Sequence, residues 1–119
     1  MSAIEASLSE LLKTPGLTGA ALVDGVTGLT YGAVGDAPEA GDGAETAELT
    51  ALITDQVGRA AADNELESVI VTSARRYLVV QTVRRTGDPL LLVAALDRSR
   101  TNLALATRQL TAHAEGLAA

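Results

Sequence analysis

The sequence offers few side chains that could perform chemistry. His113 is the only histidine, and its position predicts the last turn of the final helix. There we expect it to interact with the helix C-terminus or with solvent rather than to act in acid–base catalysis. The chain has no cysteine, which excludes disulfides, thiolate metal sites and cysteine nucleophiles. We therefore predict no catalytic residue and no enzymatic activity.

Acidic residues cluster in and after a glycine-rich stretch, GDAPEAGDG, at residues 35–43. The four that could form a weak calcium site are Asp36, Glu39, Asp42 and Glu45. Their spacing does not match an EF-hand loop. The stretch also lacks the Gly-Lys-Ser/Thr of a phosphate-binding loop, and its acidic charge repels phosphate. We therefore expect a flexible acidic loop at residues 35–45 that holds no metal and no cofactor.

Arginines close to two predicted strand ends form a second group with chemical potential. The members of this arginine cluster are Arg75, Arg76, Arg98 and Arg100. We expect them to gather at one end of the sheet derived below, close to the acidic loop. One interpretation is a binding site for an anionic partner. The other, which we favour, is internal charge balance against Asp36, Glu39 and Asp42, since each exposed pair contributes only ~0–1 kcal/mol.

Composition bounds the class of protein. A chain of 119 residues is long enough to bury a core, and we predict a single domain over residues 1–119. Hydrophobic residues make up 47% of the chain but aromatic residues only 2%, so the core must be aliphatic. No apolar run is long enough to span a membrane, and the N-terminus lacks a signal-peptide pattern. We expect a cytoplasmic protein without membrane insertion.

The charge is distributed unevenly along the chain. Residues 1–70 carry twelve acidic residues against Lys13 and Arg59, a balance of −10, whereas residues 71–119 carry seven arginines against three acids, a balance of +4; together these give −6. Nucleic-acid binding needs a positive face, and base stacking needs aromatic residues among the arginines. We therefore expect no nucleic-acid partner.

Hydrophobic periodicity and turn residues predict three helices and five strands. The helices span residues 4–12, about 46–64 and about 99–113. The strands span residues 17–23, 29–34, 67–73, 77–84 and 89–96. The resulting order, αββαβββα, places the chain in the α/β (α+β) class.

The chemistry of the strands predicts their order in the sheet. The first and fifth strands are apolar on both faces, so they belong in the centre with helices on either side. The second and third strands carry more Thr, Ser and Gly and belong at the edges. Tight turns make the last three strands a meander. These constraints predict a five-stranded antiparallel sheet of order 2-1-5-4-3 with helices on both faces.

Two segments, GAALVDGVTGLTYGAVG and LLLVAALDRSRTNLALATRQL, together with the element order, resemble the Roadblock/LC7 domain family over nearly all of the chain. The pattern of Asp97, Asn102-Leu103-Ala104 and Arg108 is similar to the family's most recognisable segment. The resemblance implies a profilin-like architecture and a non-enzymatic regulator or scaffold. It also implies association with a small Ras-like GTPase or with a larger regulatory complex. The alternative is a small-molecule sensory module of profilin- or PAS-like fold, although such a pocket usually has an aromatic wall.

The predicted middle helix has two distinct faces. Its large apolar residues, expected to face the core, are Leu49, Leu52, Ile53 and Val57, with Ala60 beside them. The opposite side, the small-residue face, carries Ala47, Ala51, Thr54, Gly58, Ala61 and Ala62. A glycine inside a helix costs ~1 kcal/mol relative to alanine, so Gly58 needs a reason. We predict that this face contacts a second subunit or a partner; the alternative is an ordinary alanine-rich surface.

The predicted edge strand ESVIVTS, residues 67–73, is open to pairing. Its central residues are β-branched, and no Lys, Pro or inward charge blunts it. The simplest use of such an edge is antiparallel pairing with its own copy, and the Roadblock/LC7 resemblance implies the same. We predict a homodimer whose interface contains Ser68, Val69, Ile70, Val71 and Thr72.

Overall fold

A computed structural model describes residues 3–61 and 63–118 of the chain. Its helices are α1 (Ala3–Leu11), α2 (Gly43–Ala60) and α3 (Leu103–Ala118), with short 3-10 turns η1 (Ala37–Ala40) and η2 (Arg98–Arg100). Its strands are β1 (Leu17–Asp24), β2 (Thr30–Gly35), β3 (Ser68–Thr72), β4 (Arg76–Val83) and β5 (Leu90–Asp97). The predicted order of the main elements is confirmed.

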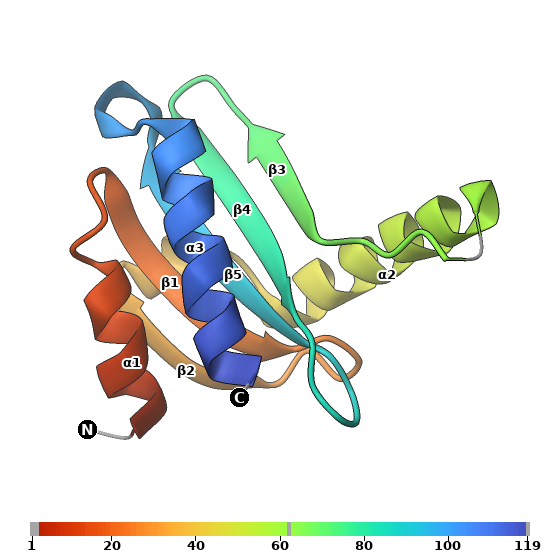
Figure 1. The fold of residues 1–119 in the computed structure, drawn as a ribbon. Helices are drawn as coiled ribbons and strands as arrows, with labels where there is room; N and C mark the ends of the chain where they lie inside the picture. The colour runs from red at the N-terminus through yellow and green to blue at the C-terminus, as the bar shows by residue number, and fades with distance from the viewer. Residues whose placement is uncertain (1–2, 62, 119) are drawn as a thin grey trace.

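The five strands form one antiparallel sheet in the order β2-β1-β5-β4-β3, as predicted (Figure 1). β5 pairs with β1 on one side and with β4 on the other. Every residue of β5 except Asp97 is buried, and β1 is buried apart from a half-buried Thr18. Because both faces of β1 and β5 are buried, their sequences carry apolar residues at both odd and even positions.

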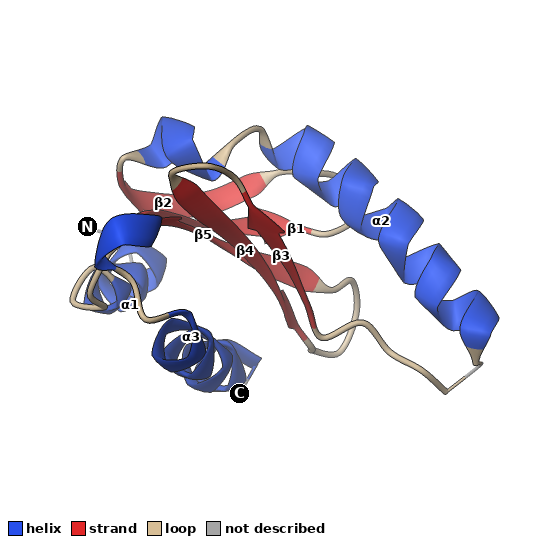
Figure 2. Ribbon diagram, turned by 90° about the horizontal axis from the view of Figure 1, so that it is seen from above, coloured by secondary structure: helices blue, strands red, loops and turns tan. Residues whose placement is uncertain are grey.

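Helices cover the two faces of the sheet unequally (Figure 2). α1 and α3 lie on one face, over an aliphatic core cluster whose largest fully buried members are Leu8, Leu92, Leu96 and Leu110. α2 lies on the other face, over a smaller cluster that includes Val23, Val80 and Val93. The face beneath α1 and α3 therefore holds the larger core.

The orientation predicted for α2 is wrong for Leu49 and Leu52, while Ile53 and Val57 are half-buried. Leu49 and Leu52, expected in the core, are 49% and 63% exposed, whereas the buried residues of the helix are Thr46, Ala47 and Thr50. The buried stripe thus lies between the two faces inferred from the sequence. Only the N-terminal part of α2 is buried, and beyond it the helix stands off the sheet (Figure 2).

Two glycines explain the close contact at the start of α2. A Cβ on Gly43 would meet the carbonyl oxygen of Gly28 at 2.5 Å, and a Cβ on Gly28 would meet the Cα of Ala44 at 2.4 Å. Neither position has room for a side chain. The first turn of α2 is therefore seated directly on the β1–β2 turn, which holds the helix by one end.

Helix boundaries differ from the prediction because of local capping. The side chain of Asp42 accepts the N–H of Glu45, so α2 begins at Gly43 rather than near Thr46. The side chain of Asp97 accepts the N–H of Ser99 and forms η2, which delays α3 until Leu103. The acidic loop contains η1, whose Ala40 is buried. Flexibility of residues 35–45 stays a prediction.

Candidate functional site

The outer edge of the sheet at β3 is an exposed, aliphatic strand. β3 pairs with β4 in continuous register, from Ser68 opposite Gln81 to Thr72 opposite Tyr77. Its other side has no strand beside it in the described part of the chain. Ile70 and Val71 are 41% and 42% exposed, and only Val69 packs partly against the core. The sequence prediction that this strand forms an edge is confirmed.

The hydrogen bonds at the two ends of β3 show which of its backbone groups are unpaired. Thr82 N–H donates to the Glu67 carbonyl and Ser73 N–H donates to the Arg76 carbonyl, each at 2.9 Å. Antiparallel partners alternate between hydrogen-bonded and non-hydrogen-bonded pairs, so the odd-numbered residues of β3 bond to β4. The backbone groups of Ser68, Ile70 and Thr72 therefore point outward in the plane of the sheet, away from β4, where another strand could bond to them.

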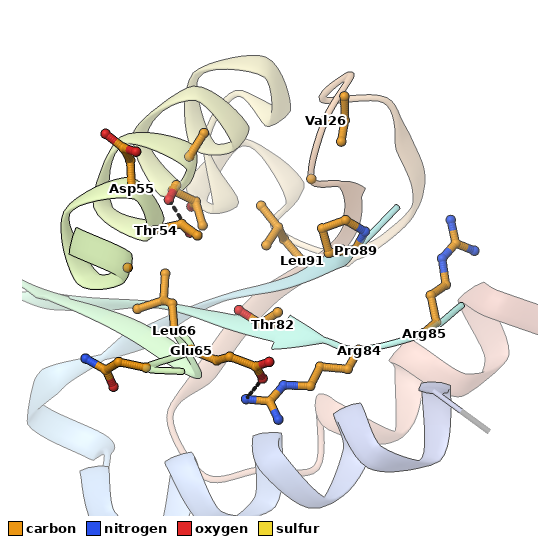
Figure 3. Close-up of a pocket in the computed structure, with 15 residues that line it drawn as sticks. Val26, Thr54, Asp55, Glu65, Leu66, Thr82, Arg84, Arg85, Pro89 and Leu91 are labelled. Atoms are coloured by element: carbon orange, nitrogen blue, oxygen red, sulfur yellow. Dashed lines mark hydrogen bonds and ion pairs between the residues drawn. The ribbon is translucent and has the colours of Figure 1, made fainter. Parts of the chain in front are cut away.

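A cleft of about 740 Å³ lies between α2 and the sheet (Figure 3). Leu66, Thr82 and Leu91 lie on its sheet side, with Thr54 on the helix facing them. Among the described residues, no aromatic side chain lines the cleft. Its charged rim includes an exposed ion pair between Arg84 and Glu65 at 3.0 Å. The cleft exists because α2 is anchored at its N-terminal end alone.

The small-residue face is divided by the structure. Ala47 is buried against the core, whereas Ala51, Thr54 and Gly58 line the cleft. A Cβ on Gly58 would meet nothing within 4 Å, so nothing in the described residues requires glycine there. Ala61 is exposed, and Ala62 lies outside the described residues. Their predicted role in a subunit or partner contact stays a prediction.

The sequence did not predict that Leu49 and Leu52 lie on the surface. They form an exposed apolar pair on the side of α2 away from the buried Thr46, Ala47 and Thr50. The signal that could have identified them is the small size of Gly43 and Ala47, since only small residues let the start of a helix approach a sheet this closely. Periodicity alone favours placing the largest apolar side chains inward.

The arginine cluster gathers at one end of the sheet, as predicted. Arg98 N–H donates to the Arg75 carbonyl at 2.9 Å, and Arg76 lies opposite Asp97 in the β4–β5 register. Arg76 forms an ion pair with Glu39 at 2.6 Å, and the Thr18 hydroxyl donates to the other oxygen of that carboxylate. Internal charge balance therefore accounts for Arg76. Neither Arg75 nor Arg98 nor Arg100 forms an ion pair within the described residues.

The predicted acidic group does not form a metal site in the described part of the chain, where no three acidic or histidine side chains come together. Glu39 binds Arg76, and Asp42 caps α2. The carboxylates of the loop are therefore used separately, one in an ion pair and one in a helix cap.

His113 connects α3 to α1. Its Nε2 lies 3.1 Å from the hydroxyl oxygen of Ser7. Burial lowers the pKa of His113, and the negative charge of Glu10 opposes this shift. A serine beside a histidine is the pairing used in nucleophilic catalysis, but neither residue lines the cleft beneath α2. The bond joins two helices on the opposite face of the sheet.

Two aspartates organise turns through backbone hydrogen bonds. Asp24 is buried and accepts the N–H groups of Val26 and Thr27 and the hydroxyl of Tyr31. The backbone bonds from Thr27 and Val26 lower the pKa of Asp24. Hydrogen bonds from Ser99 likewise lower the pKa of Asp97. Both carboxylates are ionised structural caps at neutral pH.

Comparison with known proteins identifies the fold. The chain is similar to a Roadblock/LC7 domain from Streptomyces avermitilis, with 22% identity, a TM-score of 0.79, and coverage of 98% of this chain and 95% of that chain. It is similar to Myxococcus xanthus MglB, at 22% identity and a TM-score of 0.73 over 99% of this chain and 94% of that chain. A structure described as MglB with tetrameric arrangement matches with the same identity and TM-score, over 99% of this chain and 90% of that chain.

These likenesses establish the Roadblock/LC7 fold, as the resemblance in the sequence predicted. No family model and no curated protein matches the sequence. Among the described residues, no helix combines the length and apolarity needed to cross a bilayer.

Proposed function

We propose that this protein, which has the Roadblock/LC7 fold, is a homodimeric and non-enzymatic regulator or scaffold that binds a partner protein. The observation that carries the proposal is the open edge of β3, where three residues present unpaired backbone groups beside exposed Ile70 and Val71. Natural proteins cover, charge or pair such an edge. Among the described residues, no element covers the edge of β3 and no charged residue lies in the strand, which leaves pairing.

The outward-pointing groups define the register of the proposed pairing. In an antiparallel pair, residues whose backbone groups face each other must lie directly opposite. A twofold axis at Ile70 places Ile70 opposite its own copy and Ser68 opposite Thr72 of the second copy. This register uses all three outward-pointing residues and joins two five-stranded sheets into one of ten strands.

The position of α2 supports the same dimer. The helix extends past β3, so pairing of two β3 strands brings the two α2 helices near each other (Figures 1 and 2). We propose that the exposed Leu49 and Leu52 meet the second copy there. MglB, a protein of the same fold, has been described in a tetrameric arrangement, which supports self-association as a property of this architecture.

The partner we propose is a small Ras-like GTPase, alone or within a larger regulatory complex. This part of the proposal follows from the Roadblock/LC7 resemblance. We propose in addition that the protein is cytoplasmic and that any nucleotide chemistry occurs on the partner, because the chain itself lacks a Gly-Lys-Ser/Thr phosphate-binding motif.

Two measurements test the proposal. Light scattering coupled to gel filtration at micromolar concentration should give twice the 12.1 kDa chain mass. Affinity purification from the source cell, followed by calorimetry with the purified candidate, should identify a small GTPase whose affinity depends on bound GTP or GDP. A 12.1 kDa species would contradict the dimer, and a partner outside the GTPase class would contradict the second part.

The cleft beneath α2 favours one second candidate, a small-molecule sensory module. Its volume of about 740 Å³ is in the range of ligand pockets. The absence of an aromatic wall among its lining residues weighs against this function. Native mass spectrometry decides between the two, because a sensor purified from its source should retain a stoichiometric metabolite that a scaffold would lack.

A further inference from the structure

We propose that Arg75, Arg98 and Arg100 form a docking site for an acidic segment of a partner protein. The inference rests on the proposed function only in taking the ligand to be a protein. It concerns the end of the sheet where the β3–β4 turn meets η2, away from the cleft beneath α2.

The first support is that none of the three cationic side chains forms an ion pair within the described residues, although the charge of Arg100 acts on Asp97. They lie on two adjacent segments joined by the Arg98 N–H to Arg75 carbonyl bond. The one acid among them, Asp97, accepts both the N–H and the hydroxyl of Ser99. Three positive charges against one carboxylate leave a local excess in a chain whose net charge is −6.

The second support is that Arg98 is held in place. Its Nη1 donates to the Ser73 carbonyl at 2.8 Å, and its guanidinium lies over the Tyr77 ring, 5.6 Å from the centroid. A guanidinium has five N–H donors, so most of those on Arg98 remain available. A guanidinium fixed in this way loses less side-chain entropy on binding a carboxylate than a free arginine does.

The third support is that the neighbouring arginine already binds a carboxylate. Arg76 pairs with Glu39 at 2.6 Å, and the Thr18 hydroxyl donates to the other carboxylate oxygen. This contact shows the chemistry that the end of the sheet accepts: a carboxylate held by a guanidinium and a hydroxyl. Arg75, Arg98 and Arg100 extend the same surface, and none of them forms an ion pair within the described residues.

A protein segment fits this surface better than a membrane. Binding to anionic lipid depends on clusters of about four to eight basic residues. Only three free arginines occur here, in a chain of net charge −6. A short acidic segment has few enough charges to match them.

The test uses a fluorescein-labelled peptide of glutamates around one leucine, and anisotropy measured with the full-length protein. We expect saturable binding at low salt that weakens as sodium chloride is raised. Replacing Arg75, Arg98 and Arg100 together with glutamine should weaken binding about tenfold or more. The matched control, Arg84→Gln with Arg85→Gln, removes charge from the opposite end of β4 and should change binding less than about twofold.

Because Arg98 also bonds to Ser73, a second variant keeps it and changes only Arg75 and Arg100 to glutamine. This variant should retain the circular dichroism of the parent and still lose about threefold or more in affinity. Equal weakening by the control pair, no peptide binding at low salt, or preferential binding to phosphatidylserine vesicles would overturn the proposal. Light scattering on the same variants should show an intact homodimer, so that weaker peptide binding is not attributed to loss of the dimer.

Discussion

The two edges of the sheet, β2 and β3, are built differently. β2 contains Gly32 and Gly35, and its pairing with β1 shifts register between Leu22 and Val23. α1 packs over it so closely that a Cβ on Gly32 would meet the side chain of Ile4 at 2.9 Å. A helix, an irregular register and flexible glycines all discourage pairing with another chain.

β3 has none of these protections. Its five residues, Ser68–Thr72, include no glycine, proline or charge, and its register with β4 is continuous. One sheet therefore has one irregular edge, with α1 packed over the face of its strand, and one that offers regular backbone groups and β-branched side chains. Exposure alone does not distinguish the two edges, because the β3 edge is also regular in register and apolar.

The largest expected effect comes from proline at the two edges. Ile70→Pro removes an outward-pointing donor from each copy at the centre of the proposed interface, without breaking the bonds to β4. Two lost hydrogen bonds of ~1 kcal/mol each predict dimerisation at least roughly 30-fold weaker. Light scattering should therefore show monomer or aggregate.

The matched control is Ala33→Pro in β2. Asp36 N–H donates to the Thr18 carbonyl, so by alternation the N–H of Ala33 points away from β1. This variant should remain a dimer. Loss of the dimer in both variants, or in neither, would remove the contrast between the edges.

The next effect concerns α2, which extends past β3 (Figures 1 and 2). Gly58→Glu places a long charged side chain beside the cleft, where no described atom lies within 4 Å of the new Cβ. We expect association weakened more than about tenfold, with helicity retained because glutamate is a better helix former than glycine. Gly116→Glu, an equally open position in α3, should leave the dimer unchanged in sedimentation analysis.

A smaller effect is expected from the exposed leucines. Leu52→Gln removes apolar surface that is 63% exposed, so the free energy of unfolding of the monomer should change little. If the second copy covers Leu52, the dimer should weaken by about 1–2 kcal/mol. Leu105→Gln, at 42% exposure on α3, is the control and should not change the dimer dissociation constant.

The smallest effect on association is expected at the β1–β2 turn. Asp24→Asn should lower the urea midpoint at neutral pH and leave the dimer intact, because Asp24 bonds to the β1–β2 turn and to Tyr31 of β2, far from β3 in the sheet order. Hydrogen bonds lower the pKa of Asp24 below its ordinary value of 3.8, so its stabilising contribution is complete above that pH.

The contribution is lost as pH falls through the lower, folded-state pKa. Urea unfolding at fixed protein concentration should therefore show a steeper loss below about pH 4 for the parent than for Asp24→Asn. Parallel pH profiles for the two proteins would contradict this role.

The sequence predicted the sheet because each strand carries its own signal. Continuous apolar runs can only be central, and short turns leave few ways to connect three strands. The gathering of the arginine cluster followed from the same topology. The sequence also predicted that acidic-loop residues would balance the arginine cluster, and Arg76 does pair with Glu39 of that loop.

The orientation of α2 could not be read in the same way. Periodicity shows that Leu49 and Leu52 share a face but not which apolar surface that face meets. A helix held at one end, as α2 is by Gly43 and Gly28, can present its largest side chains outward. The cleft was unforeseen for the same reason, because it arises from the angle of the helix rather than from any motif.

The pairing of β1 with β5 also constrains the order of events during synthesis. Leu17–Asp24 and Leu90–Asp97 adjoin in the centre of the sheet, although most of the chain separates them. The ribosome must therefore release β5 before the sheet can close, and until then only local hairpins and helices can form. Through that interval the nascent chain exposes the aliphatic faces of β1 and β4 together with the open edge of β3. The proposed dimerisation is accordingly a step for the completed chain, and early pairing at β3 would join molecules that still lack their central strand.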